Sequence, residues 1–217
     1  MVISELATIA KLMLTRTKEI ERKISESERE TRALQKNLED ARREAELDHL
    51  TGLPNRRAFE TVLKSEHEKA VINNEPLCVA FCDLDNFKHI NDTHGHEAGD
   101  RVLRNTAQTL AKISNDYCHV ARHGGEEFVV LFRGKGLDEA FAELDNTREQ
   151  MSQRRMVNRK TDRPFGMITF SAGIADVLCY DNPREALKAA DDALYAAKNN
   201  GRNQIVRAVL DEGRQAA

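Results

Sequence analysis

Paired carboxylates stand at the ends of two apolar runs, where together they could hold a divalent cation. Asp83 and Asp85 end the stretch LCVAFCDLD, and Glu126 and Glu127 precede the run FVVLF. If these runs form neighbouring strands, the acids meet at one sheet edge, where their repulsion is unfavourable unless a positive charge lies between them. A small number of oxygen ligands suits Mg²⁺, which takes waters and substrate phosphates for its other positions. The pattern predicts a magnesium site, although any one of these acids could simply end a strand.

Three basic residues could bind phosphate groups at the same edge. Lys88 lies about one helical turn after Asp85, and Lys198 and Arg202 flank the end of the last expected helix. Each alone has an innocent explanation, because basic side chains near helix C-termini interact favourably with the helix dipole. Their combination with the carboxylates favours a substrate that carries phosphates.

Composition excludes several other classes of function. The chain has 217 residues, and its 33 basic and 36 acidic residues give a net charge of -3, which does not indicate binding to nucleic acid or to an anionic membrane surface. The four cysteines form no CxxC pair, and three of them lie in apolar runs, so we expect buried, reduced thiols. We find no membrane-spanning run and no signal peptide, and we expect a cytoplasmic protein.

The first 47 residues form a segment with its own pattern. From Ile3 to Ala45 there is no glycine or proline, and ten of thirteen positions in a heptad seam are apolar, with mixed charge on the other faces. This pattern predicts a parallel, dimeric coiled coil; the alternative is one amphipathic helix folded back on the following domain. Ser27 and Thr31 weaken the middle of the seam. Its two columns are Leu6, Met13, Ile20, Ser27, Leu34 and Ala41, and Ile3, Ala10, Thr17, Ile24, Thr31, Leu38 and Ala45.

A hinge at DHLTGLPNRRAF, with Gly52 and Pro54, separates this segment from a domain expected over residues 48–208, which a tail of residues 209–217 follows. The domain alternates strand and helix patterns in the order βααββαβαβ, which predicts an α+β fold: a mixed, mainly antiparallel five-stranded sheet flanked by helices, close to the ferredoxin-like pattern. Gly124 and Gly125 should form a tight reversal between two strands. The expected strands are 76–85, 117–122, 126–132, 167–177 and 204–209, and the expected helices are 56–69, 86–95, 97–113, 137–153 and 183–203.

Five stretches resemble, in order, the signatures of GGDEF domains, the diguanylate cyclases that condense two GTP into cyclic di-GMP. They are DHLTGLPNRRAF, FCDLDNFKHINDTHGHEAGD, RHGGEEF, ITFSAGIA and ADDALYAAKNNGRNQ. The resemblance covers residues 48–207 and includes the active GGEEF form of the motif. It implies a nucleotidyl-cyclase-like fold, and the segment before it resembles the coiled-coil linkers that join such domains to sensors.

The resemblance implies a catalytic metal site. Asp83 and Glu126 would hold Mg²⁺ or Mn²⁺ by their side chains, and Leu84 would offer its backbone carbonyl. Glu127 would belong to a second metal site or help to deprotonate the ribose 3′-hydroxyl. Whether one metal or two are bound stays open.

The resemblance also implies a site for GTP. Asn91 and Asp100 match the residues that read guanine, where a carboxylate accepting from N1 and N2 rejects adenine. The triphosphate contacts of the family match Lys88, Lys198 and Arg202. Of these three, Lys88 is also counted as a catalytic residue. The other residues that would line the nucleotide site are Phe87, His96, Gly124 and Gly125, the two glycines leaving room for the nucleotide against the hairpin.

One GTP per domain cannot close the cyclic product, so the resemblance implies two domains that face each other in a homodimer. The heptad segment would raise the effective concentration of one domain near the other. An upstream sensor or partner protein would act through it.

One stretch departs from the family pattern. Members subject to product inhibition carry RxxD ahead of the active-site hairpin, whereas this chain has Asn115 and Cys118 at those positions. We therefore expect the inhibitory site to be degenerate. Two other classes stay open: a catalytically silent receptor for GTP or cyclic di-GMP, and a purely structural scaffold, which leaves residues 48–207 unexplained.

Overall fold

The structure is a computed structural model that describes residues 2–158 and 163–209, without the side chains of residues 2–10, 40, 42, 43, 155, 158 and 163. The chain divides into two compact units, Met1–Ala45 and Glu46–Ala217. Residues 210–217 of the expected tail lie outside the described residues, as do the side chains of Ile3, Leu6 and Ala10 of the expected seam.

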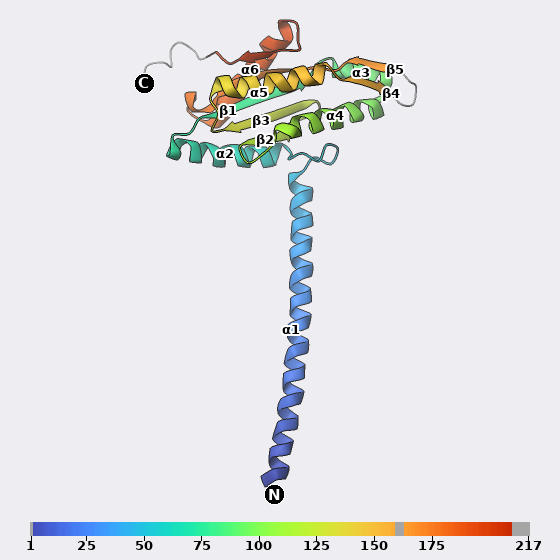
Figure 1. Cartoon of the computed structure of the whole chain (residues 1–217), viewed down its shortest axis with the longest axis vertical. Helices are drawn as coiled ribbons and strands as arrows, with labels where there is room; N and C mark the ends of the chain where they lie inside the picture. Colours follow the sequence, from blue (N-terminus) through green and yellow to red (C-terminus); the bar gives the residue numbers. More distant parts are fainter. Residues whose placement is uncertain (1, 159–162, 210–217) are drawn as a thin grey trace. The chain divides into compact units, whose positions relative to one another are not determined.

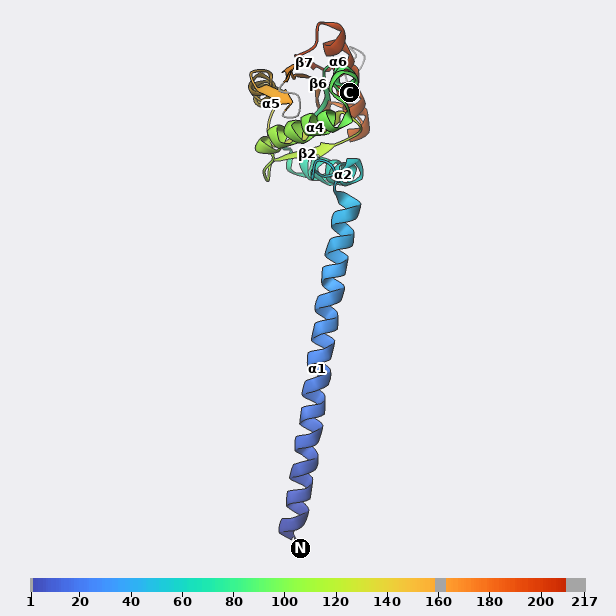
Figure 2. The ribbon, with the colours of Figure 1, turned by 90° about the vertical axis from the view of Figure 1, so that its right-hand side faces the viewer.

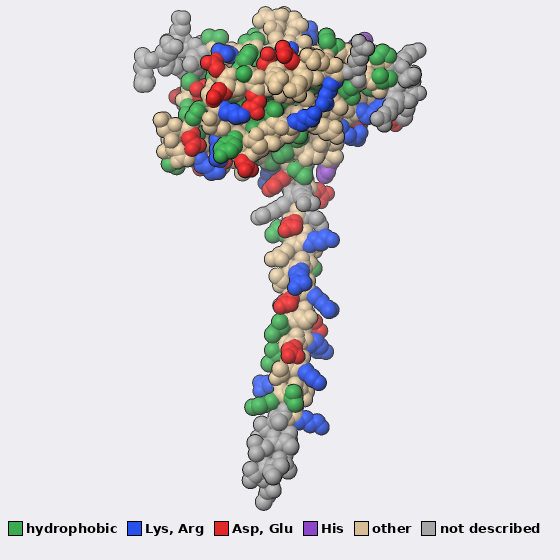
Figure 3. Space-filling model, in the orientation of Figure 1, with side chains coloured by type: hydrophobic (Ala, Val, Ile, Leu, Met, Phe, Trp, Pro, Cys, Tyr) green, Lys and Arg blue, Asp and Glu red, His purple; other side chains and the backbone are tan. Residues whose placement is uncertain are grey.

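The N-terminal segment forms one unbroken helix, α1 (Val2–Glu46), in both ribbon views (Figures 1 and 2). Large apolar side chains of the seam, among them Ile20, Ile24 and Leu34, are more than half exposed, and Figure 3 shows hydrophobic side chains on the surface of this helix among charged ones. The Thr31 hydroxyl donates to the Ser27 carbonyl at 2.9 Å. An apolar row that is exposed to solvent within its own unit is suited to packing against a partner helix.

The second unit is built on a five-stranded sheet with the strand order β2-β3-β1-β6-β7. The central strand β1 pairs antiparallel with β3 and β6, and β7 runs parallel to β6. The sheet is therefore mixed and mainly antiparallel, as predicted. The strands are β1 (Leu77–Leu84), β2 (Cys118–Arg122), β3 (Glu127–Arg133), β6 (Phe170–Asp176) and β7 (Ile205–Arg207).

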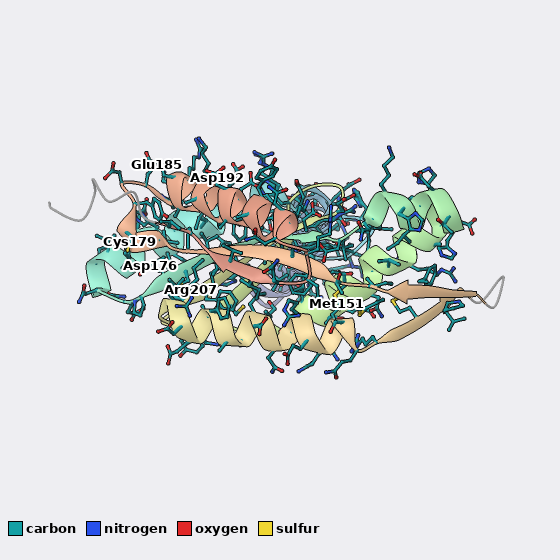
Figure 4. All side chains as sticks on the ribbon, turned by 90° about the horizontal axis from the view of Figure 1, so that it is seen from above. Met151, Asp176, Cys179, Glu185, Asp192 and Arg207 are labelled. Atoms are coloured by element: carbon teal, nitrogen blue, oxygen red, sulfur yellow. The ribbon has the colours of Figure 1, made fainter. Side chains whose placement is uncertain are left out.

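Helices cover both faces of this sheet, which explains why every residue of β1 is buried. Alternate side chains of a strand point to opposite faces, so Cys78 and Ala80 pack with α4 and α5, whereas Val79 and Phe81 pack with α2 and α6. Figure 4 shows α5 and α6 on opposite sides of the strands. The helices are α2 (Arg56–Asn73), α3 (Phe87–His94), α4 (His96–Leu110), α5 (Leu137–Ser152) and α6 (Pro183–Asn199), with short 3₁₀ turns η1 (Ala111–Ile113) and η2 (Val177–Cys179).

A two-stranded ribbon, β4 (Arg155–Asn158) and β5 (Arg163–Met167), was not predicted. Its polar sequence lacks the alternation of a strand, and tertiary contacts hold it: the Phe165 ring lies 5.0 Å from His94, edge to face, and 5.6 Å from the Arg101 guanidinium. Several boundaries also differ from the prediction: α2 continues to Asn73, β6 begins at Phe170, and α6 ends at Asn199 instead of at residue 203.

The cysteines are free, as expected, and three of them are buried. Burial raises the pKa of Cys78 and of Cys118 to about 12, so these thiols stay protonated and unreactive at neutral pH. Within the described residues, no helix has the length and apolar character needed to cross a membrane.

Candidate active site

The fold brings together acids that lie far apart in the sequence. Asp83 near the end of β1 is the cross-strand partner of Glu127 at the start of β3. The Leu84 amide donates to the Glu126 carbonyl at 3.3 Å. The predicted meeting of the two acidic pairs at one sheet edge is therefore realised by Asp83, Glu126 and Glu127.

Burial makes these three carboxylates difficult to ionise. Burial raises the pKa of Asp83, although the Lys198 ammonium lies 2.9 Å from its Oδ1 and opposes the shift. Burial, followed by the charge of Asp83, also raises the pKa of Glu126 and of Glu127. A further positive charge, in addition to the Lys198 ammonium, would favour the ionised form of these carboxylates.

The same cluster fits a hard cation. Asp83 Oδ1 is fully buried and, despite its ion pair with Lys198, has no partner in good hydrogen-bond geometry. Among the residues that the structure describes, no three His, Cys, Asp or Glu side chains lie close enough to form a metal centre alone. A cation here needs further oxygen ligands from backbone, water or a bound phosphate, a mixed set that Mg²⁺ accepts.

Asp85 does not take part in this cluster, contrary to the sequence interpretation. Its carboxylate accepts hydrogen bonds from the Thr169 and Ser171 hydroxyls, both at 2.7 Å, and from the Asn203 amide at 3.0 Å. These donors satisfy both oxygens, which leaves Asp85 a structural residue.

The two glycines of the hairpin differ in what a side chain at each position would meet. Neither Gly124 nor Gly125 has a left-handed backbone, so the loop does not need glycine for its turn. A Cβ on Gly124 would lie 2.5 Å from Glu127 Oε2, whereas a Cβ on Gly125 would meet nothing within 4 Å. Gly124 thus leaves room for the Glu127 carboxylate, and Gly125 faces open space.

Arg122 and Asp48, which the sequence analysis did not single out, hold the hairpin loop. The Arg122 guanidinium donates to both Asp48 oxygens at 2.9 Å and to the carbonyls of Gly124 at 3.1 Å and Gly125 at 2.6 Å. Burial opposes ionisation of Asp48, but hydrogen bonds from Thr51 and Arg122 outweigh it and lower the pKa of Asp48. Asp48 begins the stretch DHLTG and Arg122 begins RHGGEEF, and their opposite charges were the sequence signal for this ion pair.

The expected guanine readers lie on α3 and α4. A Cβ on Gly99 would lie 1.9 Å from Asn91 Oδ1, so the Asn91 amide rests against the backbone of α4 beside Asp100. Both residues are half-buried, whereas Lys88 and His96 are exposed and Phe87 is buried at the start of α3. Gly99 is thus a requirement of this site that motif matching did not explain.

The expected phosphate contacts lie at the end of α6. Lys198 is on the last turn of the helix, and the chain then passes through Gly201, Arg202 and Asn203, with φ angles of 113°, 65° and 47°. Left-handed backbone is uncommon for residues other than glycine and costs more at Arg202 than at Asn203, since asparagine adopts it more readily. The Arg202 side chain is exposed at this turn.

Asp191 is a further acid near the cluster that sequence reasoning missed. It lies on α6 seven residues before Lys198, which places both on one helix face. After burial, its charge is among the causes that raise the pKa of Asp83 and of Glu127. The seven-residue spacing was a signal that could have found it.

The turn that replaces the RxxD motif carries no charge at the two key positions. Asn115 and Cys118 exchange backbone hydrogen bonds of 2.9 and 3.2 Å, and Asn115 Oδ1 accepts from the Tyr117 amide. Cys118 is buried. Neither residue offers a charged side chain to a ligand.

Comparison with known proteins adds to this geometry. Residues 45–204 match the family described as "Diguanylate cyclase, GGDEF domain". Diguanylate cyclase DgcP of Pseudomonas aeruginosa is 36% identical over 183 residues, which cover 84% of this chain and 27% of the relative. The chain therefore spans about a quarter of the length of that relative.

Two solved structures are similar to this one. The coiled coil and GGDEF domain of DgcB from Caulobacter crescentus, in complex with c-di-GMP, is 34% identical with a TM-score of 0.83, covering 87% of this chain and 99% of that chain. Diguanylate cyclase SiaD of P. aeruginosa, in complex with its activator SiaC, is 27% identical with a TM-score of 0.72, covering 96% of this chain and 79% of that chain.

Proposed function

Because the chain belongs to the GGDEF family of diguanylate cyclases, we propose that it condenses two GTP into cyclic di-GMP and releases two pyrophosphates. The observation that carries this proposal is the carboxylate cluster of buried Asp83 and half-buried Glu126 and Glu127, with Lys198 2.9 Å from Asp83 Oδ1. Such a cluster is costly for the fold and is suited to a divalent cation and a polyphosphate.

The metal would be Mg²⁺ or Mn²⁺. Asp83 and Glu126 would hold it by their side chains and Leu84 by its carbonyl, and bound there it would supply positive charge opposite the phosphates. Glu127 has a raised pKa, which suits a group that takes the proton of the ribose 3′-hydroxyl, although it could instead complete a second metal site.

The remaining residues would position GTP. Asn91 and Asp100 would read the guanine edge, with Phe87 and His96 beside them and Gly124 and Gly125 leaving space for the nucleotide. Lys88, Lys198 and Arg202 would bind the triphosphate, where positive charge stabilises the pyrophosphate as it leaves.

Turnover requires two such domains. The 3′-oxygen of each GTP would attack the α-phosphorus of the GTP in the facing domain; a new P–O bond forms, the bond to pyrophosphate breaks, and the hydroxyl proton passes to Glu127 or water. The apolar row of α1 would join the two chains as a coiled-coil homodimer. A sensor or partner protein would act through α1 in the cytoplasm. The similarity to SiaD over most of the chain, and the activator with which SiaD forms a complex, support a protein partner for this chain.

The test is incubation of the full chain with GTP and Mg²⁺, with detection of cyclic di-GMP. Product formation that stops on removal of the metal supports the proposal. Binding of GTP or cyclic di-GMP without any product would support the silent receptor instead.

Weak feedback inhibition follows from the uncharged turn at Asn115 and Cys118. Initial rates measured against added cyclic di-GMP should change little over the micromolar range. Strong non-competitive inhibition would mean that other residues form the inhibitory site.

A further inference from the structure

A buried hydrogen-bond network holds the backbone of the strained turn that carries Arg202. The Asn203 amide donates to Asp85 Oδ2 at 3.0 Å, and the Thr169 and Ser171 hydroxyls hold the same carboxylate at 2.7 Å. The turn is therefore tied to the ends of β1 and β6 by its backbone, one residue after Arg202.

An arginine on α5 completes this network from the other side. Arg148 Nη1 donates to Asn203 Oδ1 at 3.0 Å and to the Asn203 carbonyl at 3.2 Å. Its Nε donates to Asp145 Oδ1 at 2.6 Å, which orients the guanidinium. The Arg148 side chain is only 13% exposed, so this geometry is set by packing as well as by hydrogen bonds.

We propose that Arg148, which lies outside every signature stretch, is a positioning residue for the triphosphate of GTP. It holds Asn203 in its left-handed conformation and thereby fixes the backbone of Arg202, whose side chain points to solvent at the active-site edge. Without Arg148, Asn203 loses one hydrogen bond to its backbone carbonyl and one to its side-chain oxygen, and the turn can relax toward ordinary φ values. This inference rests on the proposed function, because it assumes that Arg202 binds the β- and γ-phosphates.

A positioning role for Arg148 and a merely structural role predict different effects on the affinities for GTP and GMP. A turn that holds phosphates should affect binding of GTP and not of GMP, which lacks the β- and γ-phosphates. A loss of folding alone would weaken both ligands together.

The experiment compares the full chain with Arg148→Ala, Arg148→Lys and Asn203→Ala. Affinities are measured by calorimetry with Mg²⁺ for GMP and for a GTP analogue with a methylene group between the α- and β-phosphorus atoms, which cannot react. We expect Arg148→Ala to weaken the analogue by about tenfold, the loss of roughly one charged hydrogen bond, with GMP affinity unchanged and partial rescue by Arg148→Lys. Asn203→Ala combined with Arg148→Ala should weaken the analogue by less than the product of the two single effects, because both single variants lose the hydrogen bond to Asn203 Oδ1.

Arg154 provides a matched control, because this partly buried arginine donates to the Thr109 hydroxyl at 2.9 Å instead of to the turn. Arg154→Ala should leave both affinities unchanged. Equal losses for GMP and the analogue, or analogue affinity unchanged in a folded Arg148→Ala protein, would overturn the inference. If the unmodified chain does not bind the analogue at all, the proposed function itself fails.

Discussion

Asp83 and Asp85 lie two residues apart and are equally buried, at 5% exposure each, yet their surroundings differ. Three donors satisfy the Asp85 carboxylate, whereas Asp83 Oδ1 has only an ion pair with Lys198 and lies among other acids. A buried charge that the chain does not satisfy is costly, so it persists where a ligand supplies what is missing. The comparison therefore distinguishes Asp85, a carboxylate that stabilises the fold, from Asp83, a carboxylate of the candidate active site.

The sharpest test exchanges each of these carboxylates for an amide. Asp83→Asn should reduce turnover by roughly a thousandfold or more, since several kcal/mol of charge stabilisation are lost, without lowering the melting temperature. Asp85→Asn should destabilise the fold by about 2 kcal/mol, because an amide nitrogen cannot accept from those donors. Turnover assays and thermal unfolding measure both variants. A stable Asp85→Asn protein with unchanged melting temperature would contradict the distinction.

The proposed guanine site extends the comparison, because the Asn91 side chain is placed by its close packing against Gly99. A Cβ at Gly99 would lie 1.9 Å from its Oδ1, so Gly99→Ala should displace the amide. We expect KM for GTP to rise by about tenfold and the preference over ATP to fall. Steady-state kinetics with both nucleotides check this. The double variant with Asn91→Ala should be no worse than Asn91→Ala, and multiplied effects would show that Gly99 acts elsewhere.

The α1 helix has unsatisfied surface of another kind, because its apolar row is exposed and is interrupted by Ser27 and Thr31. Ser27→Leu with Thr31→Ile should tighten the dimer through added apolar burial and change turnover per dimer by several-fold, roughly the range expected when helix geometry controls domain encounter. Sedimentation and turnover at saturating GTP measure the two effects. Ser25→Leu, off the seam, is the control. A tighter dimer with unchanged turnover would make α1 a passive tether.

The smallest expected effect is the pH dependence of stability. Burial raises the pKa of Asp83, Glu126 and Glu127, so their stabilising contribution is full at low pH and is lost as pH rises through their folded values. Without metal, the melting temperature of the unmodified chain relative to Asp83→Asn should fall as the pH is raised from about 4, the ordinary carboxyl value, to the upper end of the range in which the chain stays folded. Mg²⁺ should restore it only at the upper end. The same metal effect at both pH values would be inconsistent with these carboxylates as ligands.

The sequence by itself determined every α-helix and strand that the structure describes except the β4–β5 ribbon, and it named most of the candidate site. Apolar runs bordered by acids predicted β1 and β3, the spaced signatures indicated the family, and the unbroken heptads predicted α1. These features are local, because a strand period, a heptad or a motif is contained within a few neighbouring residues. Asp83, Glu126, Asn91 and Asp100 were therefore named without a structure.

Only the tertiary structure decided which groups are satisfied. Gly124 leaves room for Glu127 only in the folded hairpin. That Asp85 belongs to the fold and that Arg148 holds Asn203 depend on contacts between residues far apart in the chain, 118 positions for Asn203 and Asp85. No local period encodes the direction in which a side chain points across such a distance. Packing of α5, β6 and the turn after α6 sets those directions, and hydrogen-bond geometry then determines which carboxylate is left for a cation.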